Sequence, residues 1–129
     1  MAKGFKWSAR SLRELKGIHP DLRKVTDRAL ELSPVDFVII DGLRTIEEQR
    51  EYVRKGASKT MRSRHLTGHA VDFACYINGK ISWHAGSMKR VADAFKTAAN
   101  ELGIKIRWGG DWRTFKDYPH IELDRRYYK

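Results

Sequence analysis

The sequence predicts a single α+β domain in which helices flank a small antiparallel sheet. Its 129 residues suffice for one domain and are too few for two. Segments with helical periodicity come first along the chain, and short strand-like runs separated by one long helix follow. No internal repeat and no linker rich in proline, glycine or serine divides the chain, so residues 1–129 are expected to form one domain.

Two helices are expected before residue 34. Ser11 and Glu14 have the spacing of a capping box, which predicts the start of the first helix. Pro20 suits the first turn of the second helix, in which apolar residues recur every three or four positions as far as Leu32. That helix is expected to end before Pro34, because the residue preceding a proline disfavours the helical conformation.

A strand and a polar helix are expected next. The apolar, partly β-branched run FVII at 37–40 is typical of a buried strand. The polar segment 45–55 is expected to form a surface helix, with Gly56 just beyond its end. The segment 57–64 has no useful periodicity and is expected to be a loop.

The second half of the chain supplies most of the predicted sheet. The segment 70–76 is expected to be a strand, and the Asn-Gly pair at 78–79 predicts a hairpin into a strand at 81–82. A helix capped by Ser87 is expected to continue to Leu102.

Two further strands are expected near the C-terminus. Ile104, Ile106 and Trp108 alternate with basic residues, which predicts a half-buried strand with Trp108 in the core. The segment 120–123 (HIEL) has the opposite alternation and is expected to be the last strand.

The composition excludes several classes of protein. Lysine and arginine number 26 and aspartate and glutamate 16, so the net charge is +10. This charge favours acidic partners such as nucleic acid, anionic lipid or wall polymers, or it only keeps a small protein soluble. The single Cys75 allows no internal disulfide and no cysteine-rich zinc module. No apolar stretch is long enough to span a bilayer, so no stable membrane insertion is expected, and the polar N-terminus has no secretory signal peptide.

Two histidines and one aspartate have the residue types of a hydrolytic metal site. Zinc in such a site takes three protein ligands and leaves one position for water. His65, Asp72 and His120 supply two imidazoles and one carboxylate from two segments that can become neighbouring strands. Asp117 lies three residues before His120 on an irregular turn, where an ionised carboxylate can accept the proton of the water.

Other interpretations of these residues remain open from the residues alone. A single histidine is more often structural than a metal ligand, and Asp117 also suits a plain turn before proline. His69 competes with His65, although the HExxH pattern of a helical metal site is absent. Glu122 is either a partner of a ligand imidazole or a solvent-facing strand residue.

Three motifs together resemble the zinc D-alanyl-D-alanine carboxypeptidase family. The segment SRHLTGHAVDF at 63–73 is similar to its S-x-H-x-x-G-x-A-x-D pattern, and DYPHIE at 117–122 to its second signature. The segment GLRT at 42–45 resembles its G-x-R-[ST] element. Motif order, spacing and chain length are most similar to the branch of short phage endolysins that cut L-alanyl-D-glutamate bonds.

The resemblance implies a role for each matching residue. Three residues are implied as zinc ligands: His65, Asp72 and His120. Asp117 is implied as the general base, Arg44 as a contact of a carboxylate or of the oxyanion, and Ser63 as a residue that lines the substrate site.

Two features of the segment before Asp117 complete the expected site. Trp112 follows Gly109-Gly110-Asp111 and is expected to line the substrate groove. Some phage relatives carry a longer acidic loop there that binds calcium, whereas the segment 113–116 (RTFK) is short and basic. The sequence therefore argues against regulation by calcium.

These observations predict a zinc peptidase that hydrolyses the L-alanyl-D-glutamate bond of the peptidoglycan peptide stem for host cell lysis. Residues 1–129 are expected to be one catalytic domain without a separate wall-binding domain, to act as a monomer, and to require no nucleic acid. The resemblance implies that the protein waits in the host cytoplasm until lysis and then acts on the wall in the periplasm. Two alternatives are a D-alanyl-D-alanine carboxypeptidase or dipeptidase, and a basic nucleic-acid-binding module without catalysis.

Overall fold

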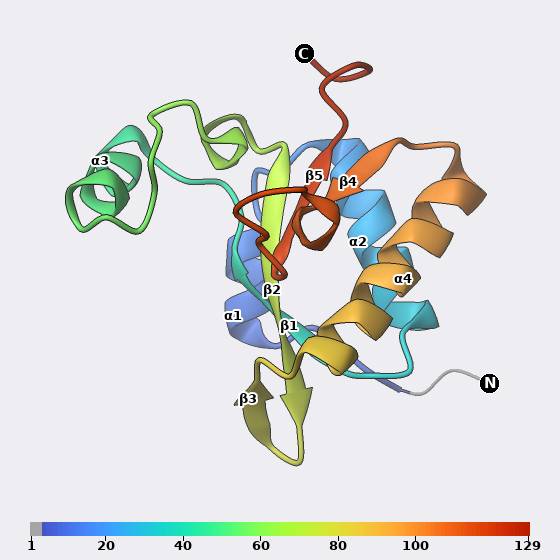
Figure 1. Ribbon diagram of the computed structural model, residues 1–129. Coiled ribbons are helices and arrows are strands. Elements are labelled where there is room, and N and C mark those ends of the chain that lie inside the picture. The colour runs from blue at the N-terminus through green and yellow to red at the C-terminus, as the bar shows by residue number, and fades with distance from the viewer. Residues whose placement is uncertain (1–3) are drawn as a thin grey trace.

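In the part of the chain that the structure describes, four helices and a five-stranded antiparallel sheet make up the fold (Figure 1). The computed structural model describes residues 4–129. The helices are α1 (Ala9–Leu15), α2 (Pro20–Leu32), α3 (Ile46–Arg54) and α4 (Ala85–Leu102), with short 3-10 turns η1 (Arg64–Thr67) and η2 (Gly109–Asp111). The strands are β1 (Phe37–Asp41), β2 (Ala70–Ile77), β3 (Lys80–Ser82), β4 (Ile106–Trp108) and β5 (His120–Leu123). This architecture confirms the predicted α+β class.

The order of the strands brings distant segments of the chain together. The sheet has the order β1-β2-β5-β4, and β3 pairs with the far end of β2 through the predicted hairpin. In the β2–β5 pair, Val71 lies opposite Ile121 and Asp72 lies opposite His120. Because side chains alternate along a strand, this register directs Val71 and Ile121 to one face of the sheet and Asp72 and His120 to the other.

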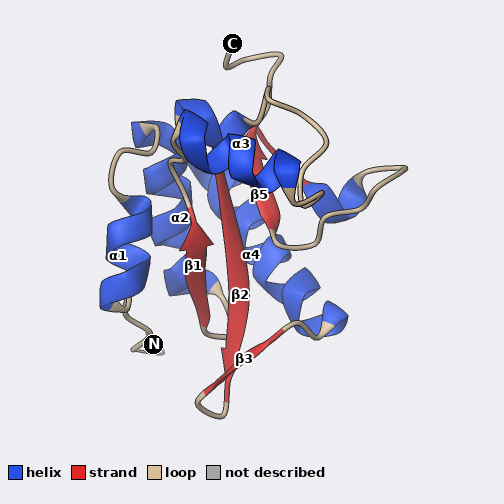
Figure 2. Cartoon of the chain, turned by 90° about the vertical axis from the view of Figure 1, so that its left-hand side faces the viewer, coloured by secondary structure: helices blue, strands red, loops and turns tan. Residues whose placement is uncertain are grey.

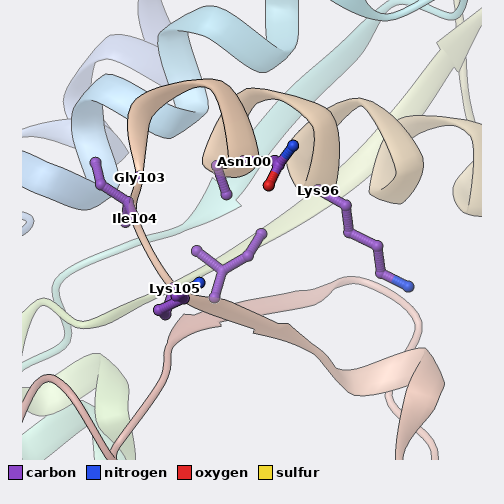
Figure 3. A pocket seen from close by; sticks show the side chains of 7 residues that line it. Lys96, Asn100, Gly103, Ile104 and Lys105 are labelled. Carbon is purple, nitrogen blue, oxygen red and sulfur yellow. The ribbon is translucent and has the colours of Figure 1, made fainter.

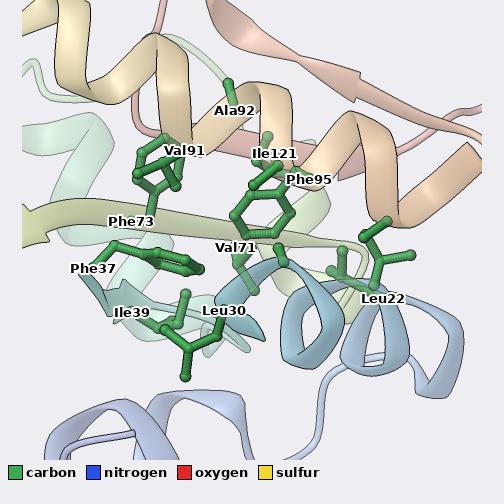
Figure 4. Close-up of a cluster of buried hydrophobic side chains, with 14 of the residues drawn as sticks. Leu22, Leu30, Phe37, Ile39, Val71, Phe73, Val91, Ala92, Phe95 and Ile121 are labelled. Carbon is green, nitrogen blue, oxygen red and sulfur yellow. The ribbon is translucent and has the colours of Figure 1, made fainter. Parts of the chain in front are cut away.

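One face of the sheet packs against α2 and α4 and forms the hydrophobic core (Figure 4). Phe37 from β1, Phe73 from β2 and Phe95 from α4 form an aromatic cluster with ring centroids 5.5–6.0 Å apart. Leu22 on α2 and Val91 on α4 belong to the same core cluster, and both are fully buried. Trp108 is 4% exposed, as predicted for a core residue.

The other face of the sheet is covered by irregular segments and carries the polar residues. Figures 1 and 2 show α3 on the opposite side of the sheet from α4, so that α3 lies in front of the strands in Figure 2 and α4 behind them. The 3-10 turn η1 contacts β2, and η2 contacts β5. The segment 57–64 is largely a loop, as expected, and η1 begins at its end.

Two predicted helix starts are wrong. The first helix is capped by Ser8, whereas Ser11 is buried inside it and its Oγ accepts a hydrogen bond from the Ile39 N–H of β1 at 3.0 Å. The last helix is capped by His84, whose Nδ1 accepts the Ser87 N–H at 3.2 Å. By contrast, α3 begins with the capping box that Thr45 forms with Glu48.

Candidate metal centre

His65, Asp72 and His120 converge on the polar face of the sheet. Asp72 on β2 lies directly opposite His120 on β5, and His65 on η1 approaches them from the loop side. Asp72 Oδ1 is 3.3 Å from His65 Nε2 and 3.1 Å from His120 Nδ1. One donor atom from each residue lies within 4.8 Å of the others, so that the three side chains are able to hold a metal ion.

Hydrogen bonds on the outer side of each imidazole fix which nitrogen faces Asp72. His65 Nδ1–H donates to the Gly42 carbonyl at 2.8 Å, since a carbonyl oxygen only accepts. His120 Nε2–H donates to Glu122 Oε1 at 2.8 Å. The remaining nitrogens, His65 Nε2 and His120 Nδ1, are therefore directed toward the carboxylate, as in metal sites whose imidazoles are held by outer partners.

The backbone position of Gly42 makes the contact to His65 possible. A Cβ atom at Gly42 would lie 1.9 Å from the carbonyl oxygen of Glu14 on α1. No side chain fits there without moving one of the two segments. The glycine of the GLRT motif thus allows its own carbonyl to sit against the imidazole.

The three residues form a charged cluster in a largely buried place. Burial opposes charge on Asp72, but hydrogen bonds from His120 and His65 outweigh it and hold its pKa well below the usual range. Burial also opposes charge on His120, but Asp72 and Glu122 raise its pKa to about 9. The two carboxylates are therefore ionised at neutral pH and favour a cation between the imidazoles.

Glu122 belongs to this cluster and is not a solvent-facing residue. Its side chain is 5% exposed, although the strand alternation predicts that it points away from the core. Burial raises the pKa of Glu122, but the hydrogen bond with His120 and the positive charges of His120 and Arg125 together outweigh burial. The net shift of this pKa is therefore downward. Of the two interpretations that the sequence left open, the structure shows the first, a partner of the His120 imidazole.

Asp117 lies beside the cluster on the turn before β5. Its carbonyl accepts the His120 N–H at 3.1 Å, and its N–H donates to the Gly109 carbonyl at 3.0 Å. A Cβ atom at Gly109 would lie 2.2 Å from the Asp117 carbonyl oxygen, so glycine is needed for this approach. Burial, together with the negative charge of Asp72, raises the pKa of Asp117.

Arg44 is held by a buried network that the sequence did not reveal. Its Nε donates to Asp41 Oδ2 at 3.1 Å and its Nη1 donates to Gln49 Oε1 at 2.6 Å, while its guanidinium lies 4.2 Å from the centre of the Tyr52 ring. Gln49 and Tyr52 lie three residues apart on α3, on the face that turns toward Arg44. Gln49 is fully buried in the structure, although the polar segment 45–55 predicts a surface helix.

Ser63 and Trp112 lie on either side of the cluster. Ser63 Oγ accepts the His65 N–H at 3.2 Å, which caps η1, and it is 3.5 Å from Arg44 Nη1. The Trp112 ring centroid is 5.2 Å from that of His120. Both predicted lining residues are therefore next to a predicted metal ligand.

His69 lies outside the cluster. Its Nδ1 is 2.6 Å from Thr67 Oγ1, and its ring packs on that of His19 with centroids 5.3 Å apart. The competition between His65 and His69 that the sequence allowed is resolved by this position: among residues 4–129, the three-residue metal group contains His65 alone of the two.

Another hollow, drawn in Figure 3, lies away from this centre between the end of α4 and β4. It is lined by Lys96, Ala99, Asn100, Gly103, Ile104, Lys105 and Ile106. These side chains offer neither a carboxylate nor an imidazole, so the metal centre is the better candidate for hydrolysis. Within residues 4–129 no helix combines the length and the apolar character that crossing a bilayer requires.

Comparisons with known proteins identify relatives of this chain. The sequence profile of the phage L-alanyl-D-glutamate peptidase family matches residues 3–129. The chain is 44% identical to the L-alanyl-D-glutamate peptidase of Escherichia phage T5, over 96% of this chain and 93% of the relative. It is 31% identical to the peptidoglycan L-alanyl-D-glutamate endopeptidase CwlK of Bacillus subtilis, over 82% of this chain and 73% of the relative.

Solved structures extend the similarity to the fold. The L-Ala D-Glu endopeptidase ChiX of Serratia marcescens superposes with a TM-score of 0.91 at 47% identity, covering 98% of this chain and 95% of ChiX. The D,D-dipeptidase VanXYg superposes with a TM-score of 0.53 at 18% identity, covering 82% of this chain and 50% of VanXYg. The second similarity concerns the fold alone.

Proposed function

The chain belongs to the phage L-alanyl-D-glutamate peptidase family, and from this premise we propose that it hydrolyses the L-alanyl-D-glutamate bond of the peptidoglycan peptide stem. The observation that carries the proposal is the convergence of His65, Asp72 and His120, with both imidazoles oriented by outer hydrogen bonds. The same chemistry fits the role of its phage relatives in host cell lysis.

We propose zinc as the metal of this centre. Two neutral imidazoles and one carboxylate are the ligand types of catalytic zinc. Neighbouring ligand atoms of a tetrahedral zinc site are about 3.3 Å apart, given bond lengths of about 2.0–2.1 Å. Asp72 Oδ1 lies at 3.3 and 3.1 Å from the two nitrogens, which matches this spacing. When bound, zinc acidifies a water molecule and polarises a carbonyl group.

Asp117 is proposed as the general base and acid. As an ionised carboxylate it accepts the proton of the water that attacks the alanine carbonyl carbon. When the carbon–nitrogen bond breaks, the same proton passes from Asp117 to the amine of the leaving glutamate residue. The contacts of its backbone to Gly109 and His120 keep Asp117 beside the cluster throughout.

Arg44 is proposed to stabilise the oxyanion. Four of the five N–H groups of a guanidinium are occupied here, by Asp41, Gln49 and Ser63. One remaining N–H suits a single developing charge better than a carboxylate, which arginine binds through two parallel hydrogen bonds. Ser63 and Trp112 are proposed to line the substrate groove next to His65 and His120.

The proposal also covers the binding partner of the protein and the cellular compartment in which it acts. Its partner is the peptide stem of peptidoglycan, and neither nucleic acid nor a second copy of the chain takes part. We propose that the protein remains in the host cytoplasm until lysis and then reaches the wall. The basic loop 113–116 argues against regulation by calcium.

A metal assay combined with mass spectrometry of digested wall fragments tests the proposal. The purified protein is expected to contain about one zinc per chain and to release fragments cut between L-alanine and D-glutamate. Asp117→Ala is expected to abolish this release with zinc still bound, whereas the matched control Asp93→Ala on the exposed surface of α4 keeps it. Loss of a terminal D-alanine alone would instead identify a carboxypeptidase, and wall lysis undiminished in Asp117→Ala would reject the assigned base.

A further inference from the structure

A second hollow, of about 390 Å³, borders the metal centre on the side of β4. Its size falls within the range of small ligand sites. It is lined by Arg107, Trp112, Arg113, Thr114, Glu122 and Arg125. Three of these six side chains carry a positive charge, and the name arginine pocket is used for this hollow below.

The arginine pocket is continuous with the metal centre through two shared residues. Trp112 lines the pocket and packs on the His120 ring at 5.2 Å. Glu122 lines the pocket and accepts the hydrogen bond from His120 at 2.8 Å. Arg107 on β4 lies directly opposite Glu122 on β5, and therefore on the same face of the sheet as the predicted metal ligands.

The lining of the arginine pocket carries more positive than negative charge, with three arginines and one carboxylate. Glu122 is the one carboxylate in the lining; it is shared with His120 and lies 3.5 Å from Arg125. The side chains of Arg107 and Arg113 form no hydrogen bond or ion pair with any residue between 4 and 129, and both are exposed. Their donors are free for an anion, and guanidinium groups suit carboxylates in particular.

The chemistry of the substrate places an anion on one side of the scissile bond. Alanine, which supplies the carbonyl carbon, has no ionisable side chain. Glutamate, which supplies the nitrogen, has two carboxyl groups, of which the onward peptide chain uses one. The other carboxylate is free, so recognition of charge belongs to the leaving side of the bond.

We propose that the arginine pocket binds the free carboxylate of the glutamate residue on the leaving side of the scissile bond, through Arg107 and Arg113. The inference rests on the proposed function and adds a specificity determinant to it. Arg44 does not serve this role, because it is 8% exposed and retains a single free N–H.

Two stem peptides test the inference, one with the glutamate carboxylate free and one with that carboxylate amidated. For the unaltered protein, kcat/KM is expected to be about tenfold or more higher on the free acid, as for one charge-assisted hydrogen bond. The double variant Arg107→Gln/Arg113→Gln is expected to have the same low kcat/KM on both peptides. The loss on the free acid is expected to come from a higher KM, with kcat nearly unchanged. Calorimetry of peptide binding to the metal-free proteins is expected to show the same loss of preference.

The control removes the same net charge elsewhere. Arg10→Gln/Arg13→Gln changes two exposed arginines of α1, which packs at β1 on the opposite edge of the sheet from β4. This variant is expected to keep the full preference at physiological salt, where long-range attraction is screened. The inference is overturned if the pocket variant keeps its preference, or if the control loses as much. If the unaltered protein cuts neither peptide, the proposed function itself fails.

Discussion

The two faces of β2 differ in what their burial achieves. Val71, Phe73 and Cys75 point into the apolar core, while Asp72 between them points toward the metal centre. The core face is closed to water by α2 and α4. On the polar face His65 and His120 are buried beneath loops and short turns, whereas Arg107 on the same face is exposed. On the core face burial stabilises the fold directly. On the polar face the side chains of the metal cluster are buried against partners: Asp72 contacts both imidazoles, His65 contacts the Gly42 carbonyl and His120 contacts Glu122. The arrangement of these partners is what we expect to determine function.

The sharpest test of this contrast changes Asp72 and leaves the core alone. Asp72→Asn keeps the shape and one acceptor oxygen, so the protein is expected to fold. It removes one proposed zinc ligand, and activity is expected to fall by about 10³-fold, since a metal contributes several kcal/mol to the transition state. Elemental analysis of zinc content checks the expected loss of the metal, and cooperative unfolding followed by circular dichroism checks that the variant still folds. Zinc retained at about one per chain, with activity intact, would remove Asp72 from the site.

The adjacent residue is expected to behave in the opposite way. Phe73→Ala leaves a cavity between Phe37 and Phe95, and the free energy of unfolding is expected to fall by about 3–5 kcal/mol. Urea unfolding measures this change. Where the variant is still folded, its zinc content is expected to match that of the unaltered protein. A stable variant that has lost zinc would contradict the division between the two faces.

A glycine on the polar side is expected to affect catalysis more than stability. Gly109→Ala places a methyl group against the Asp117 carbonyl and displaces the proposed base. A shift of about 1 Å in such a group lowers kcat by about 10²-fold. Steady-state kinetics and zinc content are the measurements, and zinc binding is expected to persist. The control Gly79→Ala lies on the β2–β3 turn, where a Cβ atom has no neighbour within 4 Å but the φ of +76° is strained for alanine. It is therefore expected to lower stability while leaving kcat unchanged.

The smallest expected effect concerns the partner of the His120 imidazole. Glu122→Gln keeps a hydrogen-bond acceptor but removes its charge, so zinc affinity is expected to fall by about 10–100-fold. Competition with a chromogenic chelator measures the affinity. The variant Glu101→Gln, on the exposed end of α4, removes an equal charge far from the site and is expected to bind zinc normally. Equal zinc affinities for Glu122→Gln and the unaltered protein would show that the charge of Glu122 does not contribute to metal binding.

The sequence was most informative where a pattern is local. The strand-like segment 70–76 and the apolar spacing of α2 predicted β2 and that helix, because each pattern depends on neighbours in the chain. The motif at 63–73 indicated His65 and Asp72 for the same reason. The positions of these segments relative to one another follow from pairing across the sheet, which single-sequence patterns do not contain.

Where the predictions failed, a contact that the sequence pattern does not encode replaced the expected one. Ser11 has the spacing of a cap, yet its hydroxyl meets a backbone group 28 residues away. Likewise the residues that hold Arg44 come from α3 and the end of β1, and Gln49 on a charged helix gave no sign of burial. The local spacing of Ser87 suggested a cap, but the His84 imidazole three residues earlier takes that position.

The hydroxyl of Ser11 has a consequence for how copies of the protein meet. An outermost strand normally presents unpaired amide groups that can recruit a strand from another molecule. Here Ser11 occupies the Ile39 amide of β1, and Glu14 occupies that of Gly42 at 3.3 Å. Helix α1 thus occupies two amide groups at this border of the sheet, which leaves fewer of them to pair with a strand from another molecule.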